Sequence, residues 1–217
     1  MSREQAPAPR IAGNFEDKYH TDHLIKKAMV TNFLRKLESM LHAVNSAGIT
    51  RVCEIGCGEG ELLKTVHAIF QQAHLFAADI SDEVVAEAKR NCAGIPVEFS
   101  IQNAEELGDY ADSSFDLVIC CEVLEHLSNP QKGLTELFRI SRDFVLVSVP
   151  NEPIWRILNI ARVKYIRTLG NTPGHLNHWN VSQFRRLLAA LPGCTTIERV
   201  YPLPWQMALL RKNAPTL

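Results

Sequence analysis

A glycine-rich stretch is the part of the chain best suited to hold a nucleotide-like cofactor. It reads E-I-G-C-G-E-G over residues 54–60 and follows a short β-rich run. Glycines there permit positive φ and let a ligand approach the backbone, and the start of a following helix presents amide donors. The spacing lacks the third glycine of the dinucleotide fingerprint, since that position is Glu61. The carboxylates of Glu54 and Glu59 would repel a pyrophosphate and suit a cationic sulfonium or amino group.

Residues at the ends of the next two predicted strands can hold a nucleoside. Asp79 ends the second strand, where a carboxylate can accept hydrogen bonds from both ribose hydroxyls. Ile80 follows it and can pack on an adenine face. Residues 102–105, Q-N-A-E, come after the third strand and offer an amide to the adenine edge. These positions predict a nucleoside site beside the glycine loop.

A second group of residues combines carboxylates with an imidazole. Glu122, Glu125 and His126 follow the fourth predicted strand. On a helical turn, Glu122 would be the neighbour of Glu125 at i+3 and of His126 at i+4. Such a group suits Mg²⁺, Mn²⁺, Fe²⁺ or Zn²⁺, and a bound ion would lower the pKa of a substrate hydroxyl. The alternative is that no metal binds and His126 is a hydrogen-bonded supporting residue; the sequence leaves both open.

Two further histidines, His175 and His178, lie in an irregular stretch before Trp179. Either is a candidate base for removing a proton from an oxygen or nitrogen acceptor, because imidazole titrates near neutral pH. A purely structural role for each histidine is equally consistent with the sequence.

Alternating strands and helices must position these groups. The predicted strands are RVCEIG, HLFAADI, VEFSIQ, FDLVICC and FVLVSVP, and two closing strands are predicted after residue 190. Helical patterns separate them, with Ser81 as an expected N-cap and Pro130 in an expected first turn. This alternation predicts an α/β fold with a doubly wound, mostly parallel, seven-stranded sheet, an N-terminal helix and an insert after strand five.

We expect one domain over residues 1–217. Its expected parts are a flexible tail (1–14), an N-terminal cap helix (15–48), a cofactor-binding core (50–150), a substrate-side insert (151–180), and a closing helix and strands (181–217).

The composition disfavours several classes of protein. Of the 217 residues, 46% are apolar and 22% are charged, close to a globular average, so disorder, collagen and coiled coil are not expected. The formal net charge of −1 disfavours a dedicated nucleic-acid binder without excluding one. The sequence contains no apolar run of membrane-spanning length and no signal-peptide pattern, which predicts a soluble, cytoplasmic protein without membrane partners. A homodimer is left open.

Together, these motifs resemble the class I S-adenosylmethionine-dependent methyltransferases, most closely the branch with an E-x-G-C-G-x-G loop and an E-V-L-E-H segment. The resemblance covers about residues 50–150 and implies a Rossmann-like methyltransferase fold with S-adenosylmethionine as cofactor. One departure is Asn103, where this branch usually has an acid. The resemblance places the cofactor against Tyr19, Glu54, Gly56, Cys57, Gly58, Gly60, Asp79, Ile80, Asn103, Ala104 and Cys121.

The E-x-x-E-H pattern also resembles two metal-dependent groups, the ubiquinone-biosynthesis-type O-methyltransferases and the small-RNA 3′-end 2′-O-methyltransferases. In the RNA group a further metal-ligating histidine precedes a tryptophan by four positions, as His175 precedes Trp179. The resemblance thus implies metal ligation by Glu122, Glu125, His126 and His175.

The expected activity is methyl transfer from S-adenosylmethionine to a small-molecule acceptor, with a hydroxyl oxygen favoured and metal assistance left open. Two alternatives stay open. One is an RNA 3′-end 2′-O-methyltransferase, favoured by the basic residues of the insert and opposed by the neutral total charge. The other is a protein that binds S-adenosylmethionine without methylating, as a cyclase or a regulatory partner.

Overall fold

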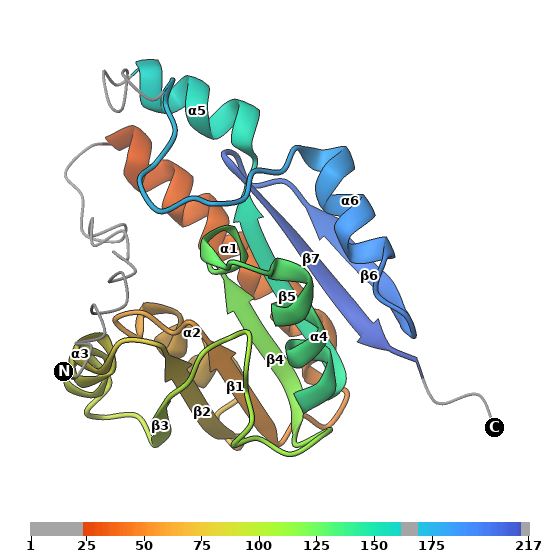
Figure 1. Ribbon diagram of the computed structural model, residues 1–217. Helices are drawn as coiled ribbons and strands as arrows, with labels where there is room; N and C mark the ends of the chain where they lie inside the picture. Colours follow the sequence, from red (N-terminus) through yellow and green to blue (C-terminus); the bar gives the residue numbers. More distant parts are fainter. Residues whose placement is uncertain (1–23, 162–168, 214–217) are drawn as a thin grey trace, which may run out of the picture.

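The computed structural model describes residues 24–161 and 169–213, and its strands form one twisted sheet (Figure 1). The order is β3-β2-β1-β4-β5-β7-β6. β7 runs antiparallel to β5 and β6, and the other neighbouring strands pair in parallel. The strands are β1 (Arg51–Ile55), β2 (His74–Asp79), β3 (Val97–Ile101), β4 (Phe115–Cys121), β5 (Ser141–Pro150), β6 (Cys194–Val200) and β7 (Trp205–Lys212). The predicted seven-stranded, mostly parallel sheet is confirmed.

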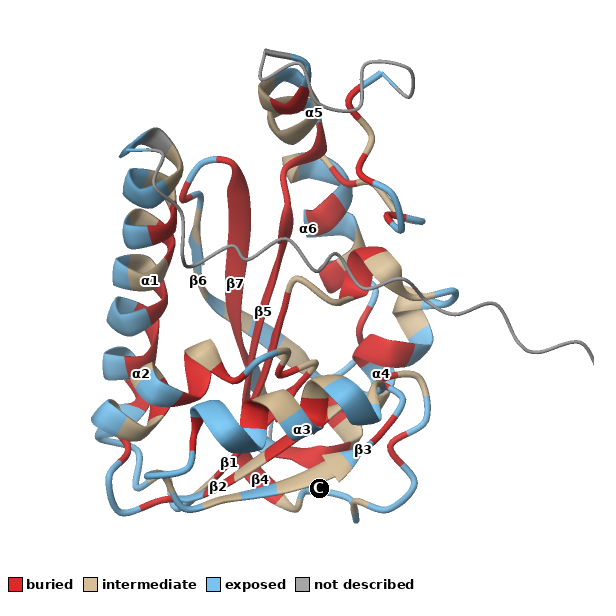
Figure 2. Ribbon diagram, turned by 90° about the vertical axis from the view of Figure 1, so that its left-hand side faces the viewer, coloured by how far each residue is buried: buried red, intermediate tan, exposed pale blue. Residues whose placement is uncertain are grey.

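Helices cover both faces of the sheet. α1 (Leu24–Asn45), α2 (Glu61–Ile69) and α3 (Asp82–Asn91) pack on one face, and α4 (Pro130–Ile140) and α6 (Val181–Ala189) pack on the other. The short 3₁₀ helix η1 (Leu124–His126) follows β4, and α5 (Glu152–Ala161) follows β5. α1 turns its buried side to the sheet and its exposed side outward (Figure 2).

Local sequence explains where several helices begin. The Ser81 hydroxyl accepts a hydrogen bond from Val84 N at the start of α3, as expected for an N-cap. Pro130 occupies the first turn of α4, where its missing amide hydrogen costs no helical bond. β4 is buried along its whole length, which explains why its sequence is almost wholly apolar.

Several of the expected parts lie only partly within the described residues. The described part of the expected cap helix is α1, which is followed by Gly48 with φ 74. The expected tail, Tyr19 and residues 162–168 of the insert lie outside the described residues. Among the helices that are described, none combines the length and apolar character needed to cross a bilayer.

Candidate active site

The glycine loop joins β1 to α2 with three left-handed glycines. Gly56, Gly58 and Gly60 have φ values of 76°, 54° and 85°. Gly56 N and Cys57 N both donate to the Ala78 carbonyl of β2, at 2.7 and 3.0 Å. A side chain at Gly56 would meet a Val123 methyl group at 2.1 Å. Glycine at position 56 therefore lets the segment after β4 close against the loop.

Asp79 is tied to the glycine loop by its carboxylate. One oxygen accepts from Gly58 N at 3.0 Å, and the other accepts from Ser81 N at 3.1 Å. Each carboxylate oxygen has two lone pairs, so both can accept a further hydrogen bond. Asp79 therefore keeps acceptor capacity beside the glycine loop, and its binding of a ribose stays a prediction.

Glu54, at the end of β1, presents a buried acid next to Asp79. Its side chain is 2% exposed, and its Oε2 atom has no hydrogen-bond partner among the residues that the structure describes. Burial, and secondarily the charge of Asp79, raise the pKa of Glu54 well above its ordinary value. A buried carboxylate without a partner is costly unless a donor or cation approaches it. This site fits a cationic ligand.

The expected adenine-binding residues have mixed environments. Ile80 is 49% exposed and can pack on a ring, and Ala104 is 7% exposed. Asn103 Oδ1 accepts from Glu105 N at 2.9 Å, so one of its lone pairs is engaged. The amide of Gln102 is buried and donates to Asp109 at 2.6 Å.

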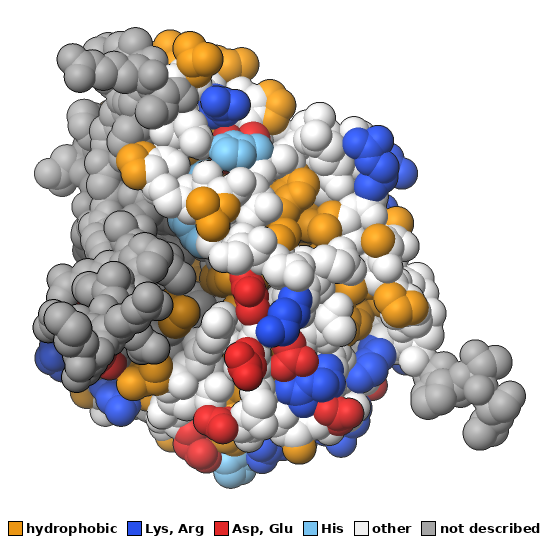
Figure 3. Space-filling model, in the orientation of Figure 1, with side chains coloured by type: hydrophobic (Ala, Val, Ile, Leu, Met, Phe, Trp, Pro, Cys, Tyr) orange, Lys and Arg blue, Asp and Glu red, His pale blue; other side chains and the backbone are white. Residues whose placement is uncertain are grey.

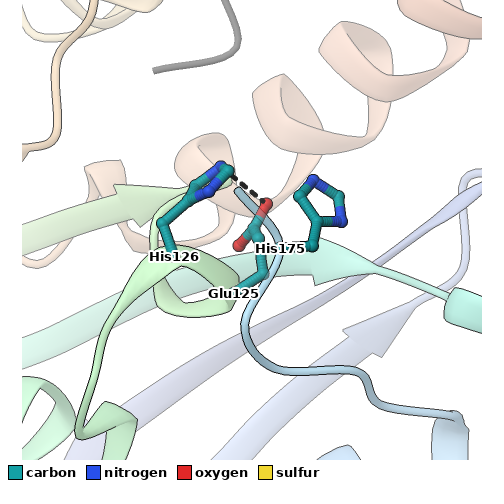
Figure 4. A group of neighbouring side chains, drawn as sticks. All are labelled: Glu125, His126 and His175. Carbon is teal, nitrogen blue, oxygen red and sulfur yellow. Dashed lines mark ion pairs between the residues drawn. The ribbon is translucent and has the colours of Figure 1, made fainter. Parts of the chain in front are cut away.

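Glu125, His126 and His175 come together at the carboxyl edge of the sheet. The three offer ligand atoms that lie within 4.8 Å of one another. Figure 4 shows the Glu125 carboxylate between the two imidazoles. The imidazole rings are 5.0 Å apart, and His126 Nε2 lies 4.0 Å from Glu125 Oε1.

Both imidazoles are oriented through Nδ1. His126 Nδ1 lies 2.9 Å from the Gly174 carbonyl, and His175 Nδ1 lies 2.9 Å from Glu152 Oε1. A carbonyl or an ionised carboxylate can only accept, so each Nδ1 carries the proton. The lone pair of each ring is then on Nε2, the atom that a metal or an acidic proton would use.

Main-chain hydrogen bonds hold the two segments of this cluster together. The amides of Leu176 and Asn177 both donate to the Glu125 carbonyl, at 2.8 and 3.0 Å. The Asn177 side chain donates to the Leu127 carbonyl at 2.6 Å. The segment before α6 is therefore clamped onto η1, although they are far apart in the sequence.

The helical turn expected at Glu122 is wrong. η1 begins at Leu124, and Glu122 has a left-handed backbone with φ 60. This conformation costs a residue other than glycine on the order of 1–3 kcal/mol. The Ser148 hydroxyl of β5 donates to Glu122 Oε1 at 3.0 Å. Glu122 is not among the three residues whose ligand atoms come together.

His178 and Cys121 lie close to the same edge. His178 Nε2 is 2.6 Å from Asn171 Oδ1, and its ring is 6.5 Å from that of His175. Burial lowers the pKa of His178, which keeps the imidazole neutral. Burial raises the pKa of the Cys121 thiol well above its ordinary value, so this thiol stays protonated.

Three residues of the site were not identified from the sequence. Glu152 binds His175, Asn177 binds the η1 segment, and the Trp155 ring stacks on His175 at 6.3 Å. Glu152 did carry a signal, since it is a lone acid in a basic stretch directly after β5. Figure 3 shows histidine atoms reaching the surface in the upper half of the molecule, close to exposed hydrophobic side chains.

The chain matches a methyltransferase family and several methyltransferase relatives. Residues 53–144 match the methyltransferase domain model. A ubiquinone biosynthesis O-methyltransferase of Xanthomonas euvesicatoria pv. vesicatoria is 28% identical over 139 residues, which cover 62% of this chain and 57% of that protein. One of Xanthomonas oryzae pv. oryzae is 27% identical over 188 residues, covering 78% and 75%. The chain therefore spans little more than half the length of the first of these curated relatives.

Solved methyltransferase structures share the fold. The magnesium protoporphyrin IX methyltransferase of Synechocystis PCC 6803, with bound SAH, has a TM-score of 0.65 at 18% identity and covers 94% of this chain and 92% of that one. The plantazolicin methyltransferase BpumL, in complex with a desmethyl analogue and SAH, has a TM-score of 0.67 at 15% identity and covers 88% and 91%. The fold expected from the resemblance is confirmed.

Proposed function

This chain carries a class I S-adenosylmethionine-dependent methyltransferase domain, and from that premise we propose that it transfers a methyl group to a hydroxyl oxygen of a small molecule, assisted by a divalent metal ion. The observation that carries the proposal is the Glu125, His126 and His175 cluster at the carboxyl edge of the sheet. Ubiquinone biosynthesis O-methyltransferases among the relatives support an oxygen acceptor.

The cofactor would lie across the glycine loop. S-adenosylmethionine supplies a methyl group on a positively charged sulfonium. Gly56 and Gly58 leave room for its methionine part, and Asp79 holds the ribose hydroxyls. The buried carboxylate of Glu54 fits the cofactor's positive charge, because its Oε2 atom lacks a donor among the described residues.

The acceptor would lie between the sulfonium and the three-residue cluster. When bound, a divalent ion lowers the pKa of a coordinated hydroxyl. Glu125, His126 and His175 would hold that ion, since one carboxylate and two imidazoles form a donor set common to Mn²⁺, Fe²⁺ and Zn²⁺. The chain's own part is to orient the acceptor, exclude water and remove its proton.

Two histidines can take the acceptor's proton. If His175 is a metal ligand, His178 is the remaining base. Its Nε2 proton is donated to Asn171, which leaves the lone pair on Nδ1 to accept. Without a metal, His175 would act as the base through Nε2, and its Nδ1 would stay bound to Glu152.

Labelled cofactor tests the proposal. The purified protein is incubated with methyl-labelled S-adenosylmethionine and a panel of phenols, catechols and aliphatic alcohols. We expect a labelled ether, with turnover that falls after exhaustive chelation and returns when Mn²⁺ or Zn²⁺ is added. Full turnover in chelated protein that contains no metal would contradict the metal assistance. A product formed from the cofactor alone, identified by mass spectrometry, would point instead to a cyclase.

An RNA 3′-end methyltransferase is the second candidate, favoured by the proximity of His175 to Glu125 and His126. The neutral total charge of the chain disfavours it. Phosphate contacts make RNA binding strongly salt-dependent. RNA affinity that is absent even at low salt would remove this candidate, whereas a labelled RNA 3′ end would displace the small-molecule proposal.

A further inference from the structure

Glu152 makes a buried contact with His175, one member of the three-residue cluster. Its side chain, at the start of α5, is 4% exposed, and His175 is 6% exposed. Glu152 Oε1 and His175 Nδ1 are 2.9 Å apart.

We propose that Glu152 is a positioning residue that fixes the tautomer and ring orientation of His175, so that Nε2 faces Glu125 and His126. This inference rests on the proposed metal-assisted function, because Nε2 matters only if it serves as ligand or base. Acceptors on the outer nitrogen of a ligating histidine orient the ring and raise its basicity.

Packing alone does not explain why an acid is buried at position 152. Within residues 24–161 and 169–213, no group donates to the second oxygen, Oε2, although it is shielded from water. Burying a carboxylate in this way is costly, so an apolar side chain would serve packing better. A role in holding His175 explains why an acid occupies the position.

Other contacts hold the segment around His175 even if Glu152 is changed. The Trp155 indole donates to the Thr172 hydroxyl at 2.8 Å, and Asn159 donates to the Gly170 carbonyl at 2.9 Å. The segment is thus anchored to α5 at two further points. A substitution at Glu152 should therefore change the tautomer and orientation of the His175 imidazole while leaving the segment in place.

His126 provides an internal comparison. Its Nδ1 is held by the main-chain carbonyl of Gly174, which a substitution cannot remove. His175 depends on a side chain instead, so its tautomer is open to test by mutation.

The test compares Glu152→Ala, Glu152→Gln and a control, Glu38→Gln, on the exposed side of α1. Co²⁺ is titrated into metal-free protein and followed by its visible absorption. The tautomer of His175 is measured separately in metal-free protein by ¹⁵N NMR. We expect Glu152→Ala to weaken Co²⁺ binding about 10–100-fold and to give a mixture of His175 tautomers. Glu152→Gln should retain most of both properties, because its amide oxygen still accepts the Nδ1 proton.

The two readouts separate this inference from the proposed function. If Glu152→Ala binds Co²⁺ like the wild type and keeps a single Nδ1-protonated tautomer, Glu152 does not position His175. If the wild type binds no Co²⁺ but Glu152→Ala still changes the tautomer, the metal proposal fails and the positioning role stands. A control variant that behaves like Glu152→Ala would overturn the inference, because it would show an effect of charge alone.

Discussion

Replacing Gly56 by alanine tests whether the glycine loop must leave room for the segment that follows β4. The added Cβ would lie 2.1 Å from Cγ2 and 3.3 Å from Cβ of Val123. The backbone there has φ 76, and a left-handed conformation costs a residue other than glycine about 1–2 kcal/mol. Overpacking adds about 1–3 kcal/mol. We expect Gly56→Ala to lower the free energy of unfolding by about 2–5 kcal/mol.

Gly58 offers a matched control in the same loop. It also has a left-handed backbone, with φ 54, but a Cβ there would meet nothing within 4 Å. Gly58→Ala should therefore lose only the backbone contribution, about 1–2 kcal/mol. The additional loss of unfolding free energy in Gly56→Ala, compared with Gly58→Ala, measures the cost of the collision with Val123. Cofactor affinity should fall in both variants, because both glycines line the expected methionine site.

Urea unfolding followed by tryptophan fluorescence gives the free energies, and calorimetric titration of S-adenosylmethionine gives the affinities. Adding Val123→Ala removes the colliding methyl group, so it should restore part of the stability lost in Gly56→Ala. The coupling energy should be about 0.5–3 kcal/mol, as for other residues in contact. Equal losses in Gly56→Ala and Gly58→Ala, or no coupling with Val123→Ala, would refute this reasoning.

Three further predictions concern the ligand sites. Glu54→Gln should stabilise the cofactor-free protein at about pH 8. Burial raises the pKa of Glu54, so the folded wild type loses stability as the pH rises above the ordinary pKa of glutamate in the unfolded chain, about 4.3. The gain should shrink as the pH is lowered and vanish only below about pH 4, which thermal melting over this pH range would show. The same variant should bind S-adenosylmethionine more weakly, and an unchanged affinity would contradict its role. Asp79→Ala should weaken cofactor binding about 10–100-fold by calorimetry, since it loses a charged acceptor for the ribose and for Gly58 N, a combined effect of roughly 1.4–2.8 kcal/mol. His126→Ala and His175→Ala should each abolish the thermal stabilisation by Co²⁺. His175→Ala should also lower the melting temperature of the metal-free protein, because it leaves the buried Glu152 carboxylate without its partner. A metal response that survives in both variants would exclude the cluster as the site.

Local patterns were sufficient to predict the framework of the fold. Strand β4 is apolar along its length, which identifies it as a buried strand. The start of α3 depends on the Ser81 hydroxyl, and the start of α4 depends on the Pro130 ring. Each effect involves only residues close in the chain, so sequence alone identifies these elements. The glycine loop was predictable for the same reason. Its glycines and Asp79 follow directly from strand ends at one edge of a parallel sheet.

The details of the cluster of Glu125, His126 and His175 depend on tertiary contacts that no local pattern contains. E-V-L-E-H suggests a helical turn, but Glu122 has a left-handed backbone and its carboxylate accepts a hydrogen bond from Ser148 on a neighbouring strand. His175 and Glu152 meet because α5 and the segment before α6 fold against each other. Spacing along the chain could indicate the residue types of this cluster, but it could not show which of them meet.

The clamp between η1 and the segment before α6 also bears on how acceptor preference could change during evolution. Its bonds run from the amides of Leu176 and Asn177 to the Glu125 carbonyl, so they depend on the main chain and not on the identity of Leu176. The Leu176 side chain is 62% exposed beside His175. Under the proposed function, a substitution at Leu176 would change the surface beside His175, while the main-chain bonds would keep Glu125 and the segment around His175 at their present spacing.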